Sequence, residues 1–162
     1  MIKYIPELTD IVLEEIPDKV TLAVEITNCR GSCPGCHSPF LKLDIGEELT
    51  PEIVDRLIAD NYGVNCFLLL GEGKDPEALL RIAEHLRRAH PDLERAVYSG
   101  RPEVEPEIYA AFDYVKVGPY IEARLGGSAS VLSTGKDGLQ RGTATKKPLR
   151  IPKDDGAVLI IR

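Results

Sequence analysis

Three cysteines in one short segment, Thr27–His37, are the residues of this sequence most able to do chemistry. Cys29, Cys33 and Cys36 are spaced C-x3-C-x2-C and directly follow an alternating apolar stretch, Val20–Ile26. Three thiolates on one loop can hold three corners of a cubane iron–sulfur cluster, because thiolate is the usual ligand of such clusters. They leave the fourth iron without a protein ligand, so a small molecule can bind at that iron.

Zinc and redox-active thiols are the alternatives for this loop. A structural zinc site takes four ligands and commonly adds a second C-x2-C or H-x3-5-H pair, and we expect no such pair downstream. His37 is the immediate neighbour of Cys36, and adjacent residues rarely ligate one ion from two good directions. The fourth cysteine, Cys66, begins the apolar run Cys66–Leu70, which predicts a buried strand, so we expect it to be a core residue. The spacing therefore favours the iron–sulfur cluster.

Length and composition predict one globular domain over residues 1–162. Hydrophobic residues make up 43% of the chain, and its formal net charge is −6. An acidic chain argues against a nucleic-acid partner, which usually meets a basic face. No apolar run reaches the ~18 residues that suggest a membrane span, and residues 1–7 contain no apolar leader segment. We therefore expect a cytoplasmic protein with no nucleic-acid and no membrane partner.

Strand and helix signals alternate along the chain. Proline follows a capping side chain in Thr50-Pro51 and again in Asp75-Pro76, which predicts two helix starts. The first helix is expected to end at 61–63, and the second at His90-Pro91. The remaining predicted elements are strands at 20–26, 64–70, 95–98, 114–117 and 157–161 and a short helix at 106–111. This alternation predicts an α/β fold with a mainly parallel sheet and right-handed crossovers.

The ends of the predicted strands carry the other candidate site residues. In parallel sheets ligands bind at the carboxyl ends of strands, and the cysteine loop leaves the first strand at that edge. The second strand ends in Gly71-Glu72-Gly73, the third in Ser99-Gly100 and the fourth in Gly118–Tyr120. Glycines there let the backbone approach a ligand, although they also serve ordinary turns. Glu72 is suited to accept charge-assisted hydrogen bonds from a ligand ammonium.

These residues resemble a known family. The cysteine motif followed by His37, the Gly71-Glu72 strand end and Gly118–Tyr120 are similar to the radical S-adenosylmethionine enzymes. Within that superfamily, Pro34-Gly35 between the last two cysteines and the lead-in segment 15–20 resemble the activating proteins of the anaerobic (class III) ribonucleoside-triphosphate reductase. The resemblance covers about residues 11–120.

The resemblance implies a partial (β/α) barrel that carries one [4Fe-4S] cluster on Cys29, Cys33 and Cys36. The amino and carboxylate groups of S-adenosyl-L-methionine would chelate the open iron. Its reductive cleavage would give a 5′-deoxyadenosyl radical, which takes hydrogen from a glycine α-carbon of the reductase. The cofactor carries this chemistry, so no side chain need act as a catalytic acid or base. The implied partners are the reductase, a glycyl radical enzyme, and an electron donor such as a flavodoxin or ferredoxin.

The resemblance also assigns cofactor-binding positions. Gly35 and His37 would flank the adenosine, and Gly71-Glu72 would meet the methionine amine. Ser99 would belong to the same cofactor-binding edge. Leu70, Ser38 and Val117 depart from the residues usual in the family at those positions.

The basic segment near the end of the chain and two alternative functions complete the expectations from the sequence. Segment 132–150 matches the family poorly, and basic residues gather between 136 and 153. The segment 132–153 is expected to be a mobile solvated loop rather than a docking surface. The partner could be another glycyl radical enzyme, or the substrate a small molecule. A non-catalytic metal module, binding zinc or carrying electrons, is the rival from a different class.

Overall fold

The computed structural model describes residues 1–36, 38–118, 149–152 and 158–161. The strands, in chain order, are β1 (Lys3–Tyr4), β2 (Asp10–Val12), β3 (Thr21–Glu25), β4 (Glu47–Glu48), β5 (Cys66–Leu70), β6 (Glu94–Ser99), β7 (Tyr114–Val117), β8 (Leu149–Pro152) and β9 (Val158–Ile161). The α-helices are α1 (Pro51–Asp60), α2 (Pro76–Ala89) and α3 (Pro106–Ala111), and two short 3-10 helices are η1 (Pro6–Leu8) and η2 (Pro39–Lys42).

Among the described residues, seven strands form one sheet in the order β2-β3-β5-β6-β7-β9-β8, and β1 pairs separately with β4. The neighbouring strands β3, β5, β6 and β7 are all parallel, whereas β2, β9 and β8 pair antiparallel with their neighbours. The predicted α/β class is confirmed, and the sheet is parallel in its central strands.

The last strand differs from the prediction. Of the predicted strand at 157–161, the described residues Val158–Ile161 form β9, but it pairs antiparallel with β7, and β8 beside it was not predicted. An apolar run indicates burial in a sheet without indicating direction. Antiparallel neighbours also need no crossover helix between them, so alternation of elements gives no signal for them.

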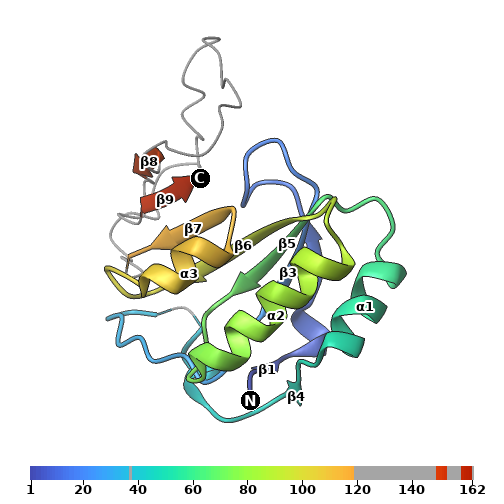
Figure 1. Ribbon diagram of the computed structural model, residues 1–162. Helices are drawn as coiled ribbons and strands as arrows, with labels where there is room; N and C mark the ends of the chain where they lie inside the picture. The colour runs from blue at the N-terminus through green and yellow to red at the C-terminus, as the bar shows by residue number, and fades with distance from the viewer. Residues whose placement is uncertain (37, 119–148, 153–157, 162) are drawn as a thin grey trace.

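The main core lies between the helices and one face of the sheet. Figure 1 shows α1, α2 and α3 on the same side of the central strands. Alternate strand residues such as Leu22, Phe67 and Val97 point to this side and pack with Leu79 and Leu86 of α2. The helices bury their apolar faces there, which accounts for their stability in so small a domain.

The opposite face of the sheet carries a smaller core. Ala23, Cys66, Leu68 and Ala96 point to this side, and Ile16 from the segment between β2 and β3 covers them. No helix among the described residues packs on this face. The described helices therefore cover only one side of the central strands.

Both predicted helix starts are confirmed by capping hydrogen bonds. The Thr50 hydroxyl accepts from the Ile53 N–H at 3.4 Å, and the Asp75 carboxylate accepts from the Ala78 N–H at 3.0 Å. His90 ends α2 by donating its backbone N–H to Leu86, as the sequence predicted.

The register of the central strands sets the position of the candidate site. Thr21, Cys66 and Glu94 lie level at the start of β3, β5 and β6, and Glu25 lies level with Leu70 near the other end. The segments that follow these strands therefore emerge at one edge of the sheet, where sequence reasoning placed the ligand.

None of the helices in the described ranges has the length and apolar character needed to cross a membrane.

The cap at Asp75 gives a test of the fold. Asp75→Ala should lower the free energy of unfolding by about 1 kcal/mol, because the Ala78 N–H loses its acceptor. Asp75→Asn keeps an oxygen in the same place and should lose less than half as much. Urea denaturation measures both, and equal losses in the two variants would show that the cap contributes nothing.

Candidate functional site

The cysteine loop lies at the carboxyl edge of the parallel strands. It begins two residues after β3 and runs across this edge, and Cys29, Cys33 and Cys36 are each half-buried. None of the chain's four cysteines forms a disulfide bond. The loop thiols are therefore available as ligands and reachable from solvent.

Backbone hydrogen bonds fix the start of this loop against the segment that returns from it. The N–H groups of Asn28 and Cys29 donate to the carbonyls of Leu43 and Leu41 at 3.3 and 2.9 Å. Asn28 has a φ of +60°, a left-handed conformation that asparagine tolerates better than most residues. This turn directs the chain away from the strand immediately before the first cysteine.

Asp44 strengthens the same contact from the return segment. Its carboxylate accepts from the Asn28 side chain at 3.1 Å and pairs with the ammonium groups of Lys3 at 2.8 Å and Lys74 at 3.2 Å. These hydrogen bonds, that of Lys3 first, lower the pKa of Asp44. The carboxylate therefore ties the cysteine loop to β1 and to the segment after β5.

The Pro34-Gly35 pair forms a tight turn between two cysteines. The Cys36 N–H donates to the Cys33 carbonyl at 3.3 Å, and Gly35 has a φ of +70°. Proline followed by a residue with positive φ is the pattern of a type II turn, in which the end residues lie within about 7 Å. The pair thus brings Cys33 and Cys36 together, and it needs glycine at position 35.

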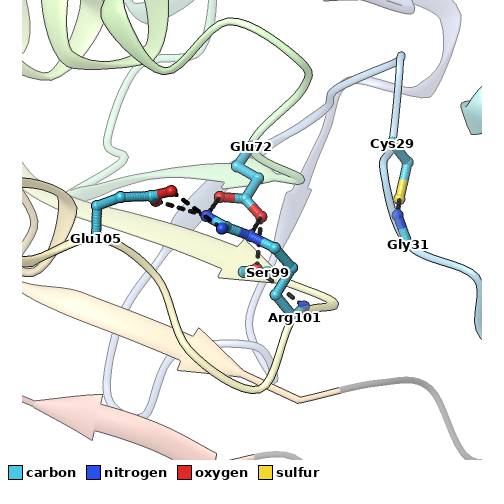
Figure 2. A network of polar contacts seen from close by, with 6 residues as sticks. All are labelled: Cys29, Gly31, Glu72, Ser99, Arg101 and Glu105. Atoms are coloured by element: carbon cyan, nitrogen blue, oxygen red, sulfur yellow. Dashed lines mark hydrogen bonds and ion pairs between the residues drawn. The ribbon is translucent and has the colours of Figure 1, made fainter.

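The sulfur atoms of Cys29 and Cys33 converge around Gly31. A β-carbon placed on Gly31 would lie 3.3 Å from Sγ of Cys29 and 3.7 Å from Sγ of Cys33. The Gly31 N–H also donates to Sγ of Cys29 at 3.3 Å, as Figure 2 shows. A β-carbon on Gly100 would lie 3.7 Å from Sγ of Cys33, so the loop reaches the end of β6.

Glu72, predicted to bind a ligand ammonium, lies at the end of β5 and is nearly buried. Its Oε1 accepts from the Ser99 hydroxyl at 2.8 Å and from Nε of Arg101 at 2.6 Å, and its Oε2 accepts from Nη2 of Arg101 at 2.6 Å. Figure 2 shows the Glu72 carboxylate and the Arg101 guanidinium facing each other. The structure thus joins two of the predicted residues, Glu72 and Ser99, by a direct hydrogen bond, and Arg101, which was not predicted, bonds to both.

Arg101 extends this network to helix α3. Its guanidinium also donates to both carboxylate oxygens of Glu105, at 3.1 and 2.6 Å. The contact with Arg101 lowers the pKa of Glu105 to about 2, and the charge of Arg30 in the cysteine loop adds to the effect. Two carboxylates hold the arginine, and they raise its pKa.

Gly71 and Gly73 have a local reason to be glycine. Gly71 has a φ of +123°, and a β-carbon there would lie 3.1 Å from the carbonyl oxygen of Ile26. Gly73 has a φ of +64° and packs against Ile26 and Ile2. Close packing of β5 on the extension of β3 accounts for both residues. The predicted contact of Gly71 with a ligand amine stays a prediction.

Some predicted residues lie outside the described part of the chain. These are His37, Pro119 and Tyr120, together with 132–148 and Lys153 of the basic segment. Of that segment, residues 149–152 are described and form β8.

Cys66 is a core residue, as predicted. It is fully buried at the start of β5, on the face opposite the helices. Burial raises the pKa of its thiol to about 12. Since the loop cysteines follow the other end of the strands, Cys66 does not belong to their site.

The expectation that the chain has no second zinc-ligand pair was wrong. His85 and His90 have the spacing H-x4-H. Both approach Asp55 of α1, and His90 ends α2 just before the start of β6. The cysteine loop lies at the other end of β6, roughly 17 Å away for a strand of this length. The histidine pair therefore does not complete a site at the cysteines.

Sequence reasoning also missed Arg101 and Asp44. The signal for Arg101 was its place, two residues after Ser99 at a strand end that faces the one ending in Glu72. Asp44 carries no comparable signal, because its role depends on how the loop folds back.

In comparisons with protein-family models, with curated proteins and with solved structures, the chain matches none of them.

The difference between the cysteines predicts a labelling pattern. Iodoacetamide at pH 8 should alkylate Cys29, Cys33 and Cys36 of the folded apoprotein and spare Cys66. The thiolate is the nucleophile, and Cys66, with a pKa raised to about 12, stays protonated and buried. Peptide mass spectrometry counts the labels, and the same reaction in urea should label all four. Labelling of Cys66 in the folded protein at the loop rate would contradict this.

The Glu72–Arg101 pair predicts a coupled loss of stability. Arg101→Gln should lower the free energy of unfolding by about 2–4 kcal/mol, because Glu72 would keep a buried charge without its partner. Arg101 is partly exposed, which reduces the cost. The double variant with Glu72→Gln should recover most of the loss. Urea denaturation of the chain itself, the two single variants and the double variant tests this, and purely additive losses would show that the pair is not coupled.

Proposed function

We propose that this protein is a radical S-adenosylmethionine activase that generates a glycyl radical on an anaerobic ribonucleotide reductase. The observation that carries the proposal is the cysteine loop: three half-buried thiols, spaced C-x3-C-x2-C, at the carboxyl edge of parallel strands. The sequence resemblance selects the family and the partner.

The residues of the loop fit a [4Fe-4S] cluster. Two of the sulfurs converge around Gly31, and the turn at Pro34-Gly35 brings Cys36 beside Cys33. Thiolates of this kind are the usual ligands of such clusters. The chain's remaining cysteine is buried in the core, so Cys29, Cys33 and Cys36 would hold three irons and leave one for S-adenosyl-L-methionine.

The chain would also tune the thiolates. The Gly31 N–H donates to Sγ of Cys29, and hydrogen bonds to sulfur stabilise negative charge and shift the potential of a cluster. Half-burial of the loop cysteines lowers the local dielectric, which destabilises the same negative charge. The protein would thus set the potential through backbone donors and solvent exposure, with no side chain acting as an acid or base.

Glu72 would bind the methionine ammonium. Its Oε1 already accepts two hydrogen bonds and its Oε2 one, so Oε2 retains an acceptor position. Arg101 and Ser99 would hold the carboxylate in a fixed orientation. This assignment gives Arg101 a positioning role and leaves Gly71 as the residue that lets the strand end pack closely.

The fold supports a partial (β/α) barrel. The strands β3, β5, β6 and β7 follow one another in space in their sequence order, and the described helices lie on one face. A barrel keeps its helices on the outside in the same way. Reduced thiols and a low-potential cluster also require a reducing compartment, so the proposal includes the cytoplasm and an electron donor such as a flavodoxin or ferredoxin.

When bound, the cluster would deliver one electron that splits S-adenosylmethionine into methionine and a 5′-deoxyadenosyl radical, which takes hydrogen from a glycine of the reductase. The described chain is small and leaves the sheet face opposite the helices without a helical cover. A protein substrate could close that side, which favours a macromolecular partner over a small molecule.

The test uses anaerobically reconstituted, reduced protein mixed with S-adenosylmethionine and an anaerobic ribonucleotide reductase. We expect 5′-deoxyadenosine by chromatography and a glycyl radical on the reductase by electron paramagnetic resonance. Cys29→Ala, Cys33→Ala and Cys36→Ala should each lose the cluster and the activity. Cys66→Ala is the matched control and should keep both, with a modest loss of stability from the cavity it leaves.

The outcomes separate the alternatives. Cleavage without a radical on the reductase would reject this partner and point to another glycyl radical enzyme or a small substrate. A reducible cluster without cleavage would reject the enzyme. A colourless protein with stoichiometric zinc at the cysteines would establish the non-catalytic metal module instead.

A further inference from the structure

A second group of metal-binding side chains lies between α1 and α2. Asp55 belongs to α1, His85 to α2, and His90 is the residue that ends α2. His90 precedes β6, so this cluster lies toward the amino edge of the parallel strands, opposite the cysteine loop. It takes no part in the proposed radical chemistry.

The three side chains converge on one point. Nε2 of His85 and Nε2 of His90 each lie 2.7 Å from the same oxygen, Oδ1 of Asp55. The three ligand atoms all lie within 4.8 Å of one another. The centres of the two imidazole rings are 6.1 Å apart, and the ring planes meet at 70°.

The fold holds these side chains in place. Asp55 follows Val54, which is fully buried, and His85 precedes Leu86, which is also fully buried. The backbone N–H of His90 donates to the Leu86 carbonyl at 2.9 Å, and its carbonyl accepts from Leu93 at 3.0 Å. All three positions are therefore fixed by the core and by backbone hydrogen bonds, as a preformed site requires.

Their chemistry matches zinc. Imidazole nitrogen and carboxylate oxygen bind Zn²⁺ at about 2.0–2.2 Å, so the ligand atoms of a tetrahedral site lie roughly 3.3 Å apart. The two 2.7 Å contacts would open by about half an ångström to admit the ion. Each neutral imidazole would carry its proton on Nδ1, which leaves Nε2 as the ligand atom. Because two of the three ligand atoms are nitrogen, the site disfavours Mg²⁺ and Ca²⁺, which prefer oxygen ligands.

We propose that Asp55, His85 and His90 form a Zn²⁺ site with three protein ligands and one water, linking α1 to α2. The side chains of the two histidines are about one quarter exposed and that of Asp55 about one half, at 24%, 23% and 47%, so the ion can enter from solvent. Binding to the folded state alone stabilises the helix pair by mass action.

The test compares the full chain with three variants. His85→Gln removes one ligand. Asp55→Asn keeps an oxygen that accepts hydrogen bonds from both imidazoles but removes the charge that a metal needs. Glu84→Gln is the matched control, since it neutralises an exposed carboxylate beside His85 that pairs with Arg87 instead. Each protein is dialysed anaerobically against Zn²⁺, and bound zinc is counted by mass spectrometry.

The chain itself and Glu84→Gln should each bind one zinc ion more than His85→Gln and Asp55→Asn. Zinc held by the cysteine loop is common to all four proteins and cancels in this difference. The melting temperature of the chain should rise more with Zn²⁺ than that of Asp55→Asn does, and neither should rise with Mg²⁺.

Equal zinc contents in all four proteins would overturn the site and leave the three residues as an ion-paired cluster. Should His85→Gln fail to fold, Asp55→Asn decides alone, because it preserves the hydrogen bonds. The result is independent of the radical activity, which is measured with a different partner and at the other edge of the sheet.

Discussion

The in-register parallel pairing of β3, β5 and β6 is the constraint on which the candidate site depends. Because these strands begin level, the cysteine loop, the Glu72 turn and the Ser99–Arg101 segment leave the sheet at one edge. A slip of one residue in β5 would turn Leu69 away from the helices and expose its apolar side chain on the other face. Burial therefore fixes the register, and the register brings the functional residues together.

The polar network at that edge connects the strand ends to one another. Arg101 ties the end of β6 to Glu72 after β5 and to Glu105 at the start of α3. Asp44 in the same way ties the cysteine loop to Lys3 and Lys74. These charged groups anchor loops that the hydrophobic core does not reach.

The sequence predicted the parts of the fold that depend on local patterns. The helix starts at Thr50-Pro51 and Asp75-Pro76 follow from capping chemistry, and the central strands follow from apolar runs that two-sided burial requires. The direction of β9 could not be predicted in this way, because strand pairing depends on the whole sheet. The same holds for Arg101, whose partner Glu72 follows the neighbouring strand β5 and lies 29 residues earlier in the chain.

The candidate site shows the same division. The cysteine spacing and the buried setting of Cys66 were readable from residue types alone, and the Pro34-Gly35 pair indicated a turn. The pairing of Asp55 with His85 and His90 could not be predicted from residue types alone, because it depends on the angle at which two helices pack. The H-x4-H spacing was the available signal, and it acquires meaning only once Asp55 is placed between the two imidazoles.

The central claim is that three loop cysteines hold a cluster with one open iron that binds S-adenosylmethionine. The most direct test is the electron paramagnetic resonance spectrum of the reduced protein, recorded with and without S-adenosylmethionine. The account predicts a cluster signal that changes shape when the ligand is added, in the chain itself and equally in Cys66→Ala. A signal that S-adenosylmethionine leaves unchanged, or the absence of any cluster after reconstitution, would contradict it.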